Sequence, residues 1–209
     1  KLEKDFQAAS TYKPNKADWL EGKWKGLVQL TGEEEFLDDE TACSLDLLRE
    51  VGYSISKKPN NIELNKKIIR QLGAKQKTIE TGKGIDWATS EALAFGTLLV
   101  EGTGVRLSGQ DSGRGTFSHR HCVLIDQSNE NRYFPLSEIR DKQAQFEIMD
   151  SPLSEAGVLG FEYGYSLADP HTLVLWEAQF GDFANGAQVI IDQFIASGES
   201  KWLRMSAIC

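Results

Sequence analysis

The sequence is poor in cysteine and in long apolar runs. Its three cysteines, Cys43, Cys122 and Cys209, are odd in number and far apart, which argues against a disulfide framework or a zinc site built on cysteine pairs and favours a reducing compartment. No run approaches the roughly 18 apolar residues that would indicate a membrane span. There is no internal repeat. Basic residues are outnumbered, and the net charge of −8 argues against a nucleic-acid partner.

What remains is the composition of an ordinary soluble globular protein. The chain has 209 residues, of which 40% are hydrophobic and 26% charged, enough for one large domain or a domain with an extension. It begins at Lys1 without an apolar targeting run. It ends in the apolar residues 204–209, which resemble the middle of a strand, so we expect a fragment of a longer protein.

The first 80 residues are interpreted as a connecting segment with short helices. An acidic run at residues 32–40 is expected to be solvated, with a docking tail as the alternative. A helix over residues 44–54 is predicted, with Ser44 as its N-cap and with Leu45, Leu48 and Val51 (or Leu47 in place of one of them) facing inward. A second short helix is predicted over residues 61–72, closed by Gly73.

From Asp86 onward the pattern alternates between helices and short strands. Asp86 is predicted to cap a helix that ends at Gly102, with four inward residues at helical spacing: Ala88, Ala92, Phe95 and Leu99. Strands are expected over residues 105–108, near 122–126 and over 172–176, and helices over 152–168 and about 186–196. This order predicts a parallel sheet covered by helices on both faces, with ligands at the carboxyl ends of its strands.

The helix predicted over residues 152–168 is unusual in its glycines. Ser151 and Pro152 are a favourable start for it, and Glu155 falls in its first turn, where unsatisfied N–H groups stabilise a carboxylate. Three glycines lie on one face (Gly157, Gly160 and Gly164), so we expect something to approach that face closely. A cofactor site and a plain helix packed on a sheet are equally good interpretations of this pattern alone.

The loop over residues 109–121 gathers cationic side chains: Arg114, His119, Arg120 and His121. Such groups suit an anionic 2-oxo acid, since arginine clamps carboxylates and histidine donates or accepts protons near neutral pH. In an extended strand His119 and His121 would share one face, although a metal site from this pair alone is not expected. Histidines that merely brace the loop are the alternative. The glycines match neither the P-loop nor the dinucleotide motif.

Three segments of the chain resemble one family. They are residues 106–121 (RLSGQDSGRGTFSHRH), 153–165 (LSEAGVLGFEYGY) and 175–194 (LWEAQFGDFANGAQVIIDQF), and residues 12–19 (YKPNKADW) look similar too. The run resembles the first, decarboxylating component of the 2-oxoglutarate dehydrogenase complex, a thiamine-diphosphate enzyme. The resemblance implies a three-layer α/β/α fold with a mostly parallel sheet, a transketolase-type pyrimidine-binding domain over residues 81–209 that is truncated at its C-terminus.

The resemblance also implies roles for individual residues. Glu155 occupies the position of the carboxyl group that drives the aminopyrimidine of the cofactor into its imino form, while Glu162 is interpreted as structural or subunit-facing. Phe183 is expected to stack on the aminopyrimidine and Phe180 to form a wall of the pocket, with two core phenylalanines as the alternative. Substrate contacts are assigned to His121, His119 and Arg114, and no metal ligand is assigned in this chain.

For the whole protein, the resemblance implies a homodimer that decarboxylates 2-oxoglutarate in the tricarboxylic acid cycle. Thiamine diphosphate and Mg²⁺ would be the cofactors, with the diphosphate and the metal held by a domain outside this chain. The succinyl group would pass to the lipoyl group of the succinyltransferase, and dihydrolipoamide dehydrogenase would complete the complex, in a bacterial cytoplasm or a mitochondrial matrix. A related 2-oxoadipate dehydrogenase and a non-catalytic isolated fragment stay open as alternatives.

Overall fold

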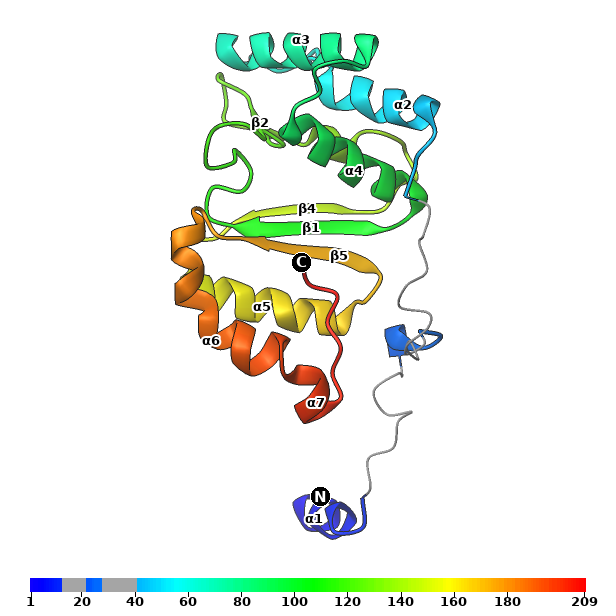
Figure 1. Cartoon of the computed structure of the whole chain (residues 1–209), viewed down its shortest axis with the longest axis vertical. Coiled ribbons are helices and arrows are strands. Elements are labelled where there is room, and N and C mark those ends of the chain that lie inside the picture. Colours follow the sequence, from blue (N-terminus) through cyan, green and yellow to red (C-terminus); the bar gives the residue numbers. More distant parts are fainter. Residues whose placement is uncertain (13–21, 28–40) are drawn as a thin grey trace.

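The fold is a parallel sheet between two layers of helices. The computed structural model describes residues 1–12, 22–27 and 41–209. Three strands, β1 (Gly104–Gly109), β4 (Phe146–Asp150) and β5 (Thr172–Glu177), form the sheet in the order β4-β1-β5, and both pairings are parallel. Helices cover both faces (Figure 1). The three-layer α/β/α architecture and the mainly parallel sheet predicted from the sequence are confirmed.

Strand β1 lies in the centre of the sheet. It pairs with β4 on one side and β5 on the other, and all its residues after the first are buried. Beyond β5, Ile208 forms a parallel bridge to Val174, and Cys209 exchanges backbone hydrogen bonds with Val174 and Trp176. The C-terminal residues therefore run beside β5 in the direction of the sheet, as expected for a strand.

Helix α4 (Trp87–Glu101) covers one face of the sheet as predicted. The Asp86 side chain accepts a hydrogen bond of 2.8 Å from the backbone N–H of Thr89, and Gly102 ends the helix with a φ of 96°. This left-handed conformation is easy only for glycine. The four residues predicted to face inward are all buried: Ala88, Ala92, Phe95 and Leu99.

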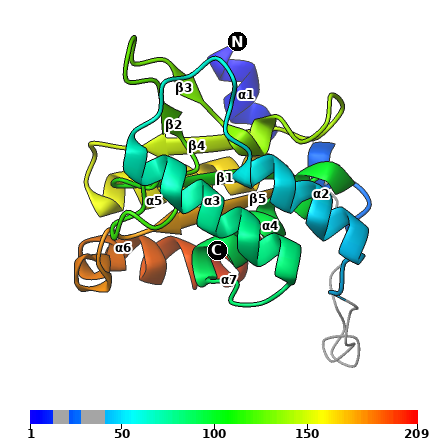
Figure 2. The same cartoon turned by 90° about the horizontal axis from the view of Figure 1, so that it is seen from above.

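Helices α2 (Leu45–Ser56) and α3 (Lys66–Thr81) lie on the same face as α4 (Figure 2). Ser44 caps α2 as predicted, and Val51 is fully buried. The inward orientation predicted for Leu45 is wrong, because Leu45 is 59% exposed; Leu48 and the alternative Leu47 are partly buried and pack against the core.

The helix predicted over residues 61–72 has different bounds. It begins after Asn65, which accepts a hydrogen bond from the backbone of Lys67, and it ends at Gly82 with a φ of 64°. Gly73 lies inside it. The helix continues past this glycine because Leu72 and Ile79 bury their side chains, Ile79 in the core that α2 and α4 share. The boundary near residue 80 between connecting segment and domain stays a prediction.

The opposite face carries α5 (Glu155–Ala168) and a broken helical run (Figure 1). The run consists of the 3-10 helix η5 (Gly181–Ala187), α6 (Gln188–Ile190), the π-helix η6 (Ile191–Ile195) and α7 (Gly198–Trp202). The single helix expected over 186–196 is thus divided into pieces. Helix α5 starts three residues later than predicted, because Ser154 and not Ser151 accepts the capping bond, from Gly157.

The glycine face of α5 has no close neighbour among the described residues. A Cβ atom at Gly157 or Gly160 would meet its nearest neighbour at an ordinary 3.5 Å, and Gly164 faces open space. Among the described residues nothing approaches this face more closely than an ordinary contact, and the expected close approach stays a prediction.

A small hairpin leaves the main sheet after the loop that follows β1. Its strands, β2 (Leu124–Ile125) and β3 (Arg132–Tyr133), pair antiparallel, so the strand predicted near residues 122–126 is present but shorter and in a separate sheet. Residues 126–131, with a turn at 127–129, join them. A 3-10 turn, η4 (Pro135–Ser137), follows and leads toward β4.

The described residues before position 41 contribute no buried side chain to the core. Helix α1 (Leu2–Ala9) has no buried residue. The turn η2 (Gly22–Trp24) contacts the end of α5, where the indole of Trp24 donates to the Leu167 carbonyl at 2.5 Å. The acidic run at 32–40 and the stretch 13–19 lie outside the described residues. No helix that the structure describes has the length and apolar character needed to cross a membrane.

Candidate functional site

Two loops meet at the carboxyl ends of β1 and β5. A Cβ atom on Gly109 would lie 2.4 Å from the Glu177 carbonyl oxygen, so only glycine lets the two strand ends come this close. Beyond it, the Thr116 hydroxyl donates to the Gln179 carbonyl at 2.7 Å, and the Gln179 amide donates to the Asp111 carboxylate at 2.6 Å. These bonds hold the loop after β1 against the loop after β5.

Glu155 is the first residue of α5 and lies beside these loops. Its side chain is half-buried, and its carboxylate forms no hydrogen bond or ion pair within the described ranges. One carboxylate oxygen, Oε2, is 3.4 Å from the position that a Cβ atom on Gly186 would take. The carboxylate therefore faces the end of η5 and is available to a ligand.

Three aromatic rings form an exposed cluster on the loop after β1 and on the segment after β5. Phe180 and Phe183 meet edge to face with ring centroids 6.0 Å apart, and Phe117 meets Phe180 in the same way at 5.7 Å. Phe180 is 43% and Phe183 47% exposed, so the alternative that both are core residues is wrong. Phe117 was not predicted, and its place in the glycine-rich segment beside the histidines was the only available signal.

Glu162 has the structural position expected of it. It is 1% exposed, and its two carboxylate oxygens accept hydrogen bonds of 2.7 and 2.9 Å from the Arg106 guanidinium. Glu147 accepts a third bond from Arg106, whose guanidinium also lies over the rings of Phe161 and Tyr165, 5.4 and 4.6 Å from the centroids. Glu162 is therefore fully engaged and separate from the exposed cluster.

Arg120 does not belong with the substrate-binding cations. It is 6% exposed, and all five of its N–H groups are used in hydrogen bonds to Glu91, Glu177 and the Ser112 carbonyl, at 2.6 to 3.0 Å. Since a guanidinium has only five donors, none is left for a ligand. Arg120 instead locks the loop after β1 onto α4 and the end of β5, which also gives Glu177 a structural role.

Arg114 and the two histidines of the loop are placed differently. Arg114 is exposed and binds Asp111 and the Ser118 hydroxyl, both within its own loop. The extended strand in which His119 and His121 would share one face is absent, because Ser118 and His121 have positive φ values of 52° and 44°. His119 is exposed, and its ring lies 6.2 Å from that of Phe117.

His121 is half-buried and lines two cavities. Burial lowers the pKa of its imidazole below the ordinary value, and the charge of Arg114 lowers it further. The ring is therefore neutral at pH 7. Among the residues that the structure describes, no three histidine, cysteine, aspartate or glutamate side chains come together as metal ligands do.

Cys122 lies at the end of the loop, and the burial of its thiol can be tested through the pH dependence of stability. The thiol donates to the Gly113 carbonyl at 3.4 Å, and burial raises its pKa to about 12 from an ordinary value of 9.0. A raised thiol pKa stabilises the fold fully below pH 9, and the contribution is lost as the pH rises toward 12. We expect the melting temperature to fall more steeply between pH 8 and 11 in the wild type than in Cys122→Ala. Parallel curves would contradict the burial.

The comparison with known proteins agrees with this architecture. A sequence model described as the transketolase pyrimidine binding domain matches residues 83–209, and the chain belongs to this family. Its curated relatives include the 2-oxoglutarate dehydrogenase E1 components of Brucella canis and Brucella suis, each 57% identical over 208 residues, and that of Brucella melitensis at 56%. The resemblance read from the sequence is thereby confirmed. The alignments cover 100% of this chain and 21% of each relative, so the chain spans about a fifth of their length.

Proposed function

We propose that the chain supplies the pyrimidine-binding half of the active site of a thiamine-diphosphate-dependent 2-oxoglutarate dehydrogenase. One observation carries the proposal: the Glu155 carboxylate, half-buried and without a protein partner among the described residues, faces Gly186 in η5, the same short helix that carries the exposed Phe183 ring. An aminopyrimidine needs such a pair of features, a carboxyl group for its ring nitrogen and a flat apolar surface for its face.

The residues present fit that cofactor. When bound, thiamine diphosphate supplies the carbon nucleophile for decarboxylation. Glu155 would hold a proton on its carboxylate oxygen against the pyrimidine ring nitrogen, and its place at the start of α5 fixes the direction of that oxygen. Phe183 would present the stacking face and Phe180 a wall of the pocket. Edge-to-face packing of the two rings holds each in one orientation.

The parts of the active site outside this chain are also proposed from the relatives. The diphosphate and Mg²⁺ would be held by another domain, in a homodimer. The succinyl group would pass to the lipoyl group of a succinyltransferase, with dihydrolipoamide dehydrogenase as the third component, in a bacterial cytoplasm or a mitochondrial matrix.

A protein of the relatives' length that carries this segment should decarboxylate 2-oxoglutarate at least tenfold more efficiently than 2-oxoadipate, measured as kcat/KM with ferricyanide as acceptor. The reverse preference would support the 2-oxoadipate alternative.

We propose that His119, His121 and Arg114 contact the carboxylate groups of the substrate. His119 is the strongest candidate because its ring is exposed and adjoins the aromatic cluster through Phe117. We expect His119→Ala to raise the KM for 2-oxoglutarate about tenfold, in line with the roughly 1.5 kcal/mol of one charge-assisted hydrogen bond, with cofactor affinity and melting temperature unaltered.

The bracing alternative makes a different prediction for the same variants. If the histidines only hold the loop, His119→Ala and His121→Ala should lower the melting temperature and leave the kinetics of the folded enzyme unchanged. Thermal unfolding and steady-state kinetics on both variants separate the two outcomes. Normal melting together with normal kinetics in both variants would remove the histidines from the site.

A further inference from the structure

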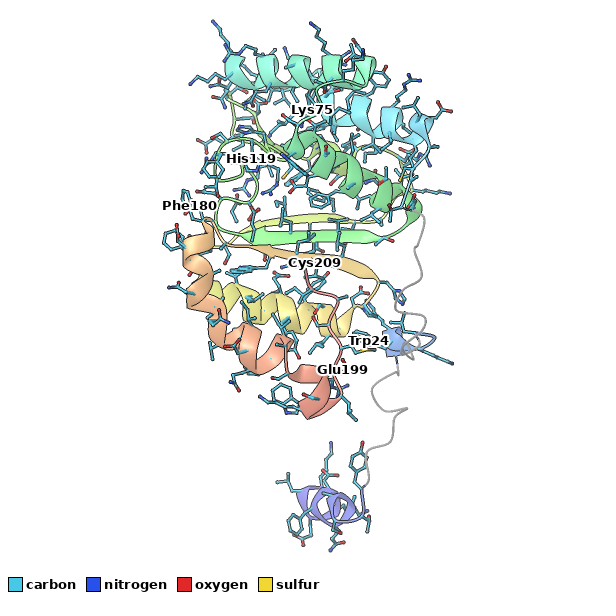
Figure 3. The ribbon with its side chains drawn as sticks, viewed as in Figure 1. Trp24, Lys75, His119, Phe180, Glu199 and Cys209 are labelled. Atoms are coloured by element: carbon cyan, nitrogen blue, oxygen red, sulfur yellow. The ribbon has the colours of Figure 1, made fainter. Side chains whose placement is uncertain are left out.

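A second cavity lies on the far side of the histidine loop, between that loop and α3. Its volume is about 330 Å³. Its polar lining comes from α3, from the start of α4 and from the loop, and includes Lys75, Asp86, His119 and His121. Neither Glu155 nor the three phenylalanines of the exposed cluster line it. In Figure 3, Lys75 lies on the side of α3 that faces the sheet, and His119 lies between it and Phe180.

Lys75 is the unexplained group in this cavity. Its side chain is half-buried, yet within the described ranges its ammonium group forms no hydrogen bond or ion pair. Burial lowers its pKa, as it does for His121, because water that would stabilise the charge is displaced. A half-buried cation without a partner is costly, and proteins keep such groups where a ligand completes them.

The nearest anionic groups are already engaged. Asp86 is the acidic residue among the described lining residues, and its carboxylate caps α4 through the backbone N–H of Thr89 at 2.8 Å. Glu91, whose charge also acts on Lys75, holds two bonds from Arg120. Asp86 and Glu91 therefore act on Lys75 through their charge alone, and no carboxylate of the described residues forms an ion pair with its ammonium group.

We propose that this cavity is an accessory binding site for a small oxyanion, a phosphate or carboxylate group, with Lys75 as the charged ligand and His119 and His121 as hydrogen-bond donors. The cavity is large enough for such a group. The Gln71 amide donates to the Ser118 carbonyl at 3.5 Å and joins α3 to the loop, so an anion that binds Lys75 and the histidines links the same two segments. The site shares His119 and His121 with the proposed substrate contacts, but its test measures labelling and needs no turnover, so the two proposals can fail separately.

The test is competitive labelling of lysines in the full-length protein saturated with thiamine diphosphate. Acetic anhydride modifies exposed amines, and mass spectrometry of peptides gives the extent at each lysine. We expect 10 mM inorganic phosphate, pyrophosphate or succinate to slow acetylation of Lys75 at least fivefold relative to chloride at equal ionic strength. Lys77, exposed on the same helix and outside the cavity, is the matched control and should not respond. The anion that protects Lys75 best shows whether the ligand carries a phosphate or a carboxylate group.

Substitution of a histidine provides the second measurement. His121→Asn keeps Lys75 in place and should reduce its protection at least threefold, since the imidazole would no longer help to bind the anion. The proposal is overturned by a Lys75 that responds to none of the anions, by equal protection of Lys77, or by a Lys75 that is unreactive even in chloride because the rest of the protein closes the cavity.

Discussion

Replacing Glu155 with glutamine in a full-length protein that carries this segment should lower kcat by roughly 10²-fold or more, the effect expected on removing a positioned acid–base group. Glutamine keeps the size and the half-buried position of the side chain but cannot hold or release the proton at the pyrimidine nitrogen. Because the phenylalanine rings and the diphosphate anchor are unchanged, we expect cofactor affinity to change far less than kcat. Steady-state kinetics and calorimetric titration of the cofactor measure both quantities.

The control for this experiment is a neighbouring carboxylate of the same site. Asp182 is exposed on η5, the helix that carries Phe183, and the structure assigns it no partner among the described residues. Asp182→Asn removes one negative charge near the cluster, so it tests whether local charge alone affects turnover. We expect kcat within about twofold of the wild type. Equal losses in the two variants, or a fully active Glu155→Gln protein, would remove Glu155 from its assigned role.

The sequence predicts best where local signals agree with packing. The cap at Asp86, the helical spacing of four apolar residues and the glycine at 102 place α4 within one residue of its observed bounds. The position of Glu155 in the first turn of its helix followed from similar signals, although its N-cap is Ser154. The exposure of Phe180 and Phe183 could not be predicted in the same way, because a sequence alone does not reveal whether a phenylalanine in a loop is buried in the core or exposed on the surface.

The predictions failed where distant residues decide the structure. Gly73 costs about 1 kcal/mol relative to alanine in a helix, yet α3 continues through it because Leu72 and Ile79 bury their side chains. Arg120 looked like a substrate ligand, but its partners Glu91 and Glu177 lie 29 and 57 residues away. Strand β4 was missed because it is short and only Phe146 among its residues is buried.

Disrupting the buried ion pair between Arg106 and Glu162 should have the largest effect on stability. Glu162→Gln leaves the guanidinium buried against Glu147 with only part of its charge compensated, and the loss of one partner of a buried pair costs about 3–5 kcal/mol. Glu162 lies on α5 and Arg106 on the central strand, so the cost affects the contact between two layers. We expect a much lower free energy of unfolding, measured with urea.

Two comparisons separate this burial effect from a general effect of charge. Glu50 pairs with Arg140 at 2.6 Å on the surface, with both side chains well exposed, and Glu50→Gln should lower the free energy of unfolding far less than Glu162→Gln does. The double variant Arg106→Met with Glu162→Leu removes both charges together and should recover most of the stability lost in Glu162→Gln, because no uncompensated charge stays buried. If the double variant is as unstable as the single one, the contact between α5 and β1 depends on the shape of the pair and not on its charge balance.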